Sequence, residues 1–118
     1  MSHIIIFDKK RNWYGANWAG RNLVYRVREH LPQDSSKHLV ERLGHIDDFP
    51  GCNVDLSELS VDELRALLAA AEKAVAATRA AGPSSFQDPS FFPGFLQKFE
   101  EFTHMVEDKI EAVTKNRV

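Results

Sequence analysis

The sequence predicts a helix-dominated α+β fold, a single two-layer domain with about four helices and one or two short strands. The length of 118 residues fits one domain. Apolar side chains recur at helical spacing over several stretches, and one β-branched run near the N-terminus is typical of a strand. Apolar residues make up 43% of the chain and charged residues 27%, a composition that excludes disorder over most of its length.

The N-terminal run is the predicted strand. Residues 3–7 read His-Ile-Ile-Ile-Phe, and we expect this continuous apolar stretch to be buried on both faces of a sheet. Residues 13–20 combine aromatic side chains with glycine, which predicts either a turn or the frayed start of a helix.

Two helices are expected next. Helical spacing of apolar residues predicts the first over about residues 17–31, where a proline ends it. The second is expected over about residues 35–43, with Leu39, Val40 and Leu43 turned inward.

The clearest helix signal lies in the second half of the chain. Residues 44–57 look irregular apart from a possible strand over residues 52–56. Ser60 and Glu63 then have the spacing of a capping box, in which each side chain accepts a hydrogen bond from the other residue's backbone N–H. This box opens an alanine-rich helix that we expect to end at about Ala81.

A linker over residues 82–94 separates that helix from a final one, expected over about residues 93–116. Each long helix carries an apolar stripe, with Leu64, Leu67, Leu68, Ala71 and Val75 on the first and Phe95, Phe99, Phe102, Val106, Ile110 and Val113 on the second. Because the connection is short, we expect the two helices to pack antiparallel through these stripes.

Motifs for cofactors and metals are incomplete, and we expect the protein to bind neither. Residues 15–20 have the glycine spacing of a phosphate-binding loop but lack the Lys and Ser/Thr that must follow it. Glu101 and His104 match half of a di-iron site, yet the sequence holds no second copy, and His104 falls on the predicted solvated face.

The net charge of −2 conceals a strong asymmetry, because residues 1–43 carry +4 and residues 44–118 carry −6. Residues 47–63 contain no basic side chain, and four of their acidic residues are candidate contacts for a basic partner: Asp47, Asp48, Asp55 and Glu58. The alternative is a solvated loop that leads into a helix, with Asp62 and Glu63 stabilised by the helix dipole.

A second candidate contact set lies on the first predicted helix, where Trp18, Arg21, Tyr25 and Arg28 recur at steps of three and four residues. We expect the aromatic side chains Trp13, Tyr14, Trp18 and Tyr25 to be exposed. Trp, Tyr and Arg are enriched among the residues that dominate binding energy, so Trp18, Tyr25 and Arg28 form this set. The alternative is that the aromatic rings complete the core edge while Arg21 and Arg28 pair with the acidic segment.

The expected location is a reducing cytoplasm. Cys52 is the single cysteine, so no internal disulfide can form. The apolar runs are far shorter than the ~20 residues that span a bilayer, and the N-terminal run is too short for a signal-peptide core. We therefore expect no membrane partner.

Residues 54–68, an apolar-acidic segment that leads into a capped helix, resemble small cytoplasmic immunity proteins of bacterial toxin–immunity pairs, including those of contact-dependent growth inhibition. The resemblance implies a protein without turnover of its own that neutralises a cognate toxin, often a nuclease, by stoichiometric binding. One alternative is a nucleic-acid-binding regulator with Lys9, Lys10, Arg11, Arg21 and Arg28 as phosphate contacts, which the acidic balance beyond residue 43 disfavours. A third is a small enzyme with a His/Asp site, which needs a pocket that gathers His45, Asp47, Cys52 or His104.

Overall fold

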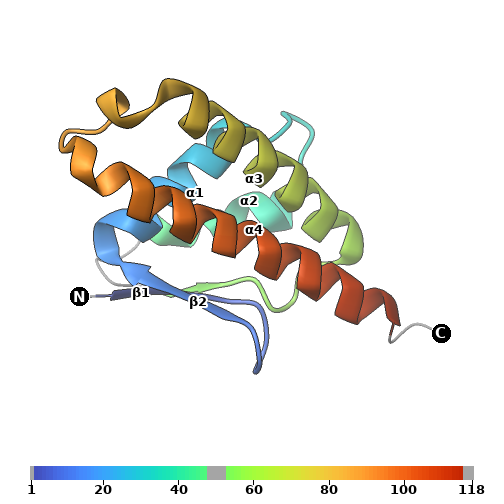
Figure 1. The fold of residues 1–118 in the computed structure, drawn as a ribbon. Helices are drawn as coiled ribbons and strands as arrows, with labels where there is room; N and C mark the ends of the chain where they lie inside the picture. The colour runs from blue at the N-terminus through green and yellow to red at the C-terminus, as the bar shows by residue number, and fades with distance from the viewer. Residues whose placement is uncertain (1, 48–52, 116–118) are drawn as a thin grey trace.

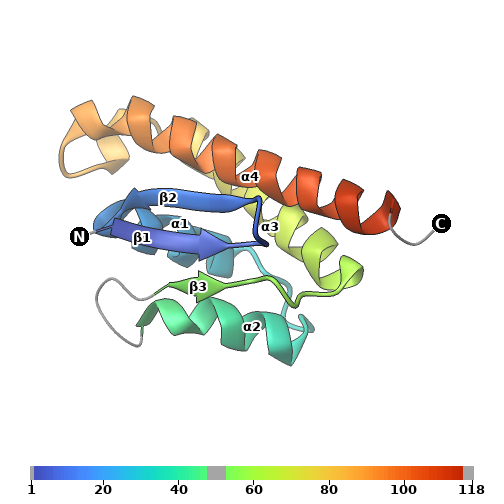
Figure 2. The ribbon, with the colours of Figure 1, turned by 90° about the horizontal axis from the view of Figure 1, so that it is seen from below.

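The computed structural model describes residues 2–47 and 53–115, and it confirms the helix-dominated α+β fold. A small sheet forms one layer, and the helices lie over one side of it (Figures 1 and 2). The elements are β1 (Ser2–Ile6), β2 (Asn12–Ala16), α1 (Asn17–Glu29), α2 (Lys37–Gly44), β3 (Val54–Asp55), α3 (Val61–Ala81) and α4 (Phe92–Lys115), with 3-10 turns η1 (His45–Asp47), η2 (Pro83–Ser85) and η3 (Pro89–Phe91).

The sheet has the strand order β2-β1-β3 and buries one face against the helices. Strand β1 pairs antiparallel with β2 and parallel with β3. Because side chains alternate between the faces of a strand, the cross-strand partners Ile5 and Trp13 are buried, whereas Ile4 is half-buried and its partner Tyr14 is exposed. The expectation of a strand buried on both faces is therefore wrong, since no described helix covers the second face (Figure 2).

Strand β2 corrects two further expectations. It occupies residues that predicted a turn or a frayed helix, and it raises the number of described strands to three. Trp13 is 0% exposed instead of lying at the surface, and its indole Nε1 donates a hydrogen bond to the carbonyl oxygen of Lys98 at 2.8 Å. Gly15 leaves room for the indole, because a Cβ at that position would lie 2.3 Å from Trp13 Cη2.

The helices begin and end close to the predicted residues. The capping box is confirmed, with Glu63 N donating to Ser60 Oγ at 3.1 Å and Ser60 N donating to Glu63 Oε1 at 2.9 Å. The inward placement of Val40 is wrong, because its side chain is 46% exposed. It lies about 100° around the helix from Leu39, while Leu39 and Leu43 fill the buried face.

Helices α3 and α4 lie side by side and run in opposite directions, as expected (Figure 1). Most of both predicted stripes is buried: Leu64, Leu67, Ala71 and Val75 on α3, and Phe95, Phe99, Phe102 and Val106 on α4. Leu68, Ile110 and Val113 are half-buried. Two apolar helix faces and the inner face of the sheet therefore share one core.

Candidate functional site

Two large aromatic side chains stay at the surface where α1 begins and the α3–α4 linker ends. Trp18 is 41% exposed and Phe91 is 50% exposed, and their rings stack with centroids 5.3 Å apart. Trp18 also stacks on the buried ring of Phe95 at 5.9 Å, which fixes its orientation. We call the Trp18–Phe91 pair the aromatic ridge. The sequence predicts Trp18 as a candidate contact but does not predict Phe91.

The linker holds Phe91 in place through short-range contacts. Asp88 accepts hydrogen bonds from the backbone N of Ser90 at 3.0 Å and from its Oγ at 2.6 Å, which caps the 3-10 turn η3. Phe86 packs edge-on against Phe92 at 5.8 Å and against Phe95 at 5.3 Å. The linker is thus an ordered aromatic segment that supplies one half of the ridge.

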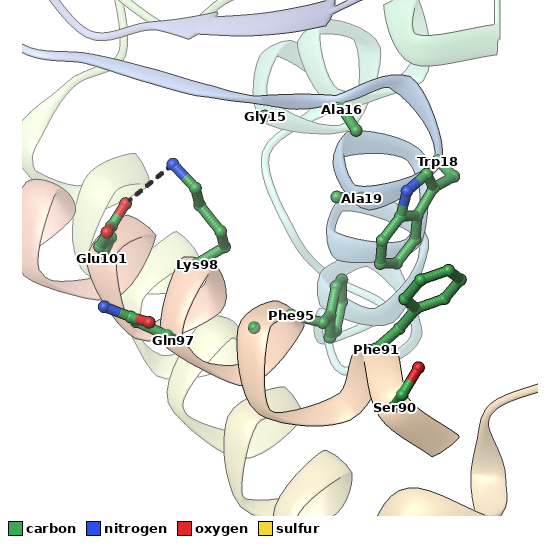
Figure 3. Close-up of a pocket in the computed structure, with 11 residues that line it drawn as sticks. Gly15, Ala16, Trp18, Ala19, Ser90, Phe91, Phe95, Gln97, Lys98 and Glu101 are labelled. Atoms are coloured by element: carbon green, nitrogen blue, oxygen red, sulfur yellow. Dashed lines mark ion pairs between the residues drawn. The ribbon is translucent and has the colours of Figure 1, made fainter. Parts of the chain in front are cut away.

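A hollow of about 440 Å³ lies on one side of the aromatic ridge (Figure 3). Small residues from β2, α1 and α4 line it, namely Gly15, Ala16, Ala19 and Gly94. The ridge and Phe95 stand on one side, and the ion pair of Lys98 and Glu101, 3.4 Å long, stands on the other (Figure 3). The arrangement is a shallow, mostly apolar recess that suits an apolar side chain of another molecule.

A second hollow, of about 460 Å³, lies on the other side of the ridge. Its lining combines Trp18, Phe86 and Phe91 with the polar residues Asn22, Arg26, Ser85, Gln87 and Asp88. The ridge is therefore a wall shared by two recesses of different polarity.

Tyr25 and Arg28 lie further along the exposed face of α1 and line neither hollow. Tyr25 is 39% exposed, and the Arg28 guanidinium lies 5.7 Å from the centre of its ring. The structure therefore places Trp18, Tyr25 and Arg28 on one helix, with only Trp18 at the recesses. Trp18 and Tyr25 are exposed as expected, and so is Tyr14, at 56%, on the open face of the sheet.

Two of the four acidic candidates, Asp55 and Glu58, have side chains that the structure describes. Asp55 accepts a hydrogen bond from Ser57 N at 2.9 Å, and hydrogen bonds from Ser57 lower the pKa of that carboxyl. Glu58 is highly exposed and pairs with Arg42 at 3.4 Å. Asp47 is the last residue of η1, directly before the undescribed residues 48–52. Asp48 and Cys52 lie outside the described residues.

Glu63 has a larger role than the capping box predicts. It also accepts a hydrogen bond from Ser36, the N-cap of α2, and lies 3.3 Å from His38 Nδ1. Burial raises the pKa of Glu63, but the hydrogen bonds from Ser36, Ser60 and His38 outweigh this effect and lower the pKa to about 2. One carboxylate thereby joins the N-termini of α2 and α3.

The incomplete motifs stay apart in the structure. His104 is exposed on α4, and among residues 2–47 and 53–115 no three His, Cys, Asp or Glu side chains gather as metal ligands. Residues 15–20 divide between the end of β2 and the first turn of α1. No helix in this part of the chain combines the length and apolar content needed to cross a bilayer.

A cationic recess was not evident from the sequence. A hollow of about 490 Å³ joins the β1–β2 turn to the last turns of α4 and is lined by Lys9, Lys10, Arg11, Lys109 and Lys115 together with Asp8. Asp8 holds Arg11 at 2.8 Å and Lys109 at 3.2 Å. Burial raises the pKa of Asp8, yet hydrogen bonds from Lys10 N, Lys109 and Arg11 lower it to about 2.

Comparisons with protein-family models, with curated proteins and with solved structures each found no match for this chain.

Proposed function

We propose that this protein is a cytoplasmic protein-binding module that neutralises a bacterial toxin by forming a stoichiometric complex. The observation that carries the proposal is the aromatic ridge, an exposed Trp–Phe stack with a recess on each side. Rigid aromatic side chains lose little conformational entropy on binding and are enriched among the residues that dominate interface energy.

The class of partner follows from the resemblance of residues 54–68 to immunity proteins and from the charge pattern of the chain. Asp55, at the end of β3, and Glu58, between β3 and α3, carry negative charge. Asp47 and Asp48 add negative charge earlier in the sequence. A nuclease toxin has a basic cleft for its substrate, so an acidic partner approaches it faster through electrostatic steering.

Growth rescue tests the proposal. The protein is co-expressed with the product of the neighbouring gene, which the proposal expects to be a growth-inhibiting toxin. Wild type should restore growth and co-purify with that product at a one-to-one ratio. Trp18→Ala and Phe91→Ala should reduce rescue, whereas Val40→Ala, which truncates a similarly exposed apolar residue on α2, should not. Lack of rescue by wild type, or full rescue by both ridge variants, contradicts the proposal.

The cationic recess favours one alternative, a nucleic-acid-binding regulator. Lys9, Lys10 and Arg11 gather there as that alternative requires, together with Lys109 and Lys115 from α4. Arg21 and Arg28 lie on α1 and do not line this recess. Sub-micromolar binding to duplex DNA at physiological salt, with affinity falling steeply as salt rises, would establish the regulator in place of the toxin inhibitor.

A further inference from the structure

We infer that the second hollow beside the aromatic ridge binds a single carboxylate attached to an apolar group, with Arg26 as the residue that recognises it. The recess holds about 460 Å³, and Arg26 lines it from α1. This inference rests on the proposed function only for the identity of the ligand, which would be an acidic side chain of the partner protein next to an apolar one.

Arg26 is a half-buried cation that forms no ion pair with a carboxylate of the described residues. Its Nη1 donates to Thr78 Oγ1 at 3.1 Å, and no carboxylate of residues 2–47 or 53–115 forms an ion pair with it. Its Nε is buried and donates no hydrogen bond. The enclosed Nε is out of reach of a ligand, so an anion in the recess would accept from Nη2 and from the second N–H of Nη1. Charged groups removed from water are normally paired, and this guanidinium lacks such a partner among the described carboxylates.

Aromatic rings hold the guanidinium in a fixed position. Its central carbon lies 5.1 Å from the ring centre of Phe86 and 5.5 Å from that of Phe95. Thr78 Oγ1, which accepts from the guanidinium, in turn donates to the carbonyl oxygen of Ala74 at 2.8 Å. A planar guanidinium fixed in this way can donate to both oxygens of a carboxylate without losing much further freedom.

One lining residue disfavours a ligand with several negative charges. Asp88 is at the same recess, and its carboxylate already accepts two hydrogen bonds from Ser90. Its negative charge would repel a polyanion such as a nucleic-acid backbone. The faces of Trp18 and Phe91 instead suit an apolar group beside the carboxylate.

Binding of phenylacetate, followed by NMR, tests this inference on the full-length protein. The indole N–H signal of Trp18 reports on the recess, while that of buried Trp13 serves as an internal reference. Phenylacetate should shift the Trp18 signal along a saturable curve. Its neutral isostere phenylacetamide should bind at least about tenfold more weakly, because hydrogen bonds between charged groups are roughly twice as strong as neutral ones.

Variants of two arginines on the same helix complete the test. Arg26→Gln should weaken phenylacetate binding at least about tenfold, whereas Arg21→Gln, which is outside the recess, should bind like wild type. If Arg26→Gln does not fold, Arg26→Lys retains the charge without the two-pronged donor and should bind more weakly than wild type.

Equal affinity for phenylacetate and phenylacetamide, absence of a saturable shift, or unchanged binding in a folded Arg26 variant would overturn the inference. Because no toxin is present in this experiment, its failure leaves the growth-rescue result untouched. Failure of growth rescue likewise leaves the phenylacetate result standing as evidence for a carboxylate site.

Discussion

At the scale of single residues, close contacts decide positions that sequence patterns leave open. Trp13 and Gly15 are two residues apart in β2 and therefore lie on the same face of the sheet. The missing side chain of Gly15 gives the indole its space. The sequence supplies both residues but not their pairing with β1, which turns this segment into a strand. Local composition could therefore predict a turn here but not a buried tryptophan.

Gly15→Ala should destabilise the protein by about 1–3 kcal/mol, because the new methyl group must displace a fully buried ring. Urea unfolding measures this loss. Gly44→Ala is the matched control, since a Cβ at Gly44 meets no atom within 4 Å. Equal midpoints for Gly15→Ala and wild type would show that the indole moves aside without cost.

The carboxylate of Glu63 predicts a dependence of stability on pH. The pKa of Glu63 falls from the ordinary 4.5 to about 2 in the folded protein. The contribution of this carboxylate to the free energy of unfolding is therefore complete above the ordinary pKa and is lost as the pH falls through the pKa of the folded state. Glu63→Gln should lose about 1 kcal/mol at neutral pH, within the range for helix caps.

Urea unfolding at about pH 7 and about pH 3 measures this effect. The difference in unfolding free energy between wild type and Glu63→Gln should be smaller at the lower pH. Glu58→Gln, at an exposed surface ion pair, should show a gap near zero at both values. A Glu63→Gln gap that is the same at both pH values would contradict the assigned role.

At the scale of elements, periodicity and caps predicted most of the fold. The capping box located α3, and the Phe stripe located α4, because each signal depends on neighbours in the sequence. The candidate site could be predicted only in part from the sequence. Trp18 was identified from its helix, but Phe91 was assigned only to a linker, and its stacking on Trp18 joins segments far apart in the chain.

The packing of α3 against α4 predicts a large effect from one truncation. Phe99 is 0% exposed and contacts the ring of Phe95 at 5.7 Å, so Phe99→Ala should cost about 3–5 kcal/mol of unfolding free energy. The truncation Val113→Ala, at a half-buried position near the end of the same helix, should cost much less. A loss below about 1 kcal/mol for Phe99→Ala would remove this stripe from the core.

At the scale of the whole molecule, two different surfaces lie at opposite ends of the sheet. The aromatic ridge lies where the α3–α4 linker meets the start of α1, and the cationic recess lies at the β1–β2 turn (Figure 2). The charge asymmetry along the sequence predicted an uneven surface but not this arrangement. Lys109 and Lys115 belong to the acidic part of the chain, yet they join the basic turn through the fold.

The central claim is that the aromatic ridge and its recesses bind a protein, and Gly94→Leu tests it most directly. A Cβ at Gly94 meets no atom within 4 Å, so the new side chain should fill the first hollow without disturbing the core, and leucine favours a helix over glycine. Gly44→Leu adds the same side chain at the end of α2, away from both recesses.

Isothermal titration calorimetry of each variant with the proposed toxin, identified by growth rescue and purified, provides the measurement. Wild type and Gly44→Leu should bind with one-to-one stoichiometry and similar affinity, whereas Gly94→Leu should bind at least about tenfold more weakly, as expected for a blocked interface pocket. Gly94→Leu that remains folded and binds the toxin as tightly as wild type would contradict the claim.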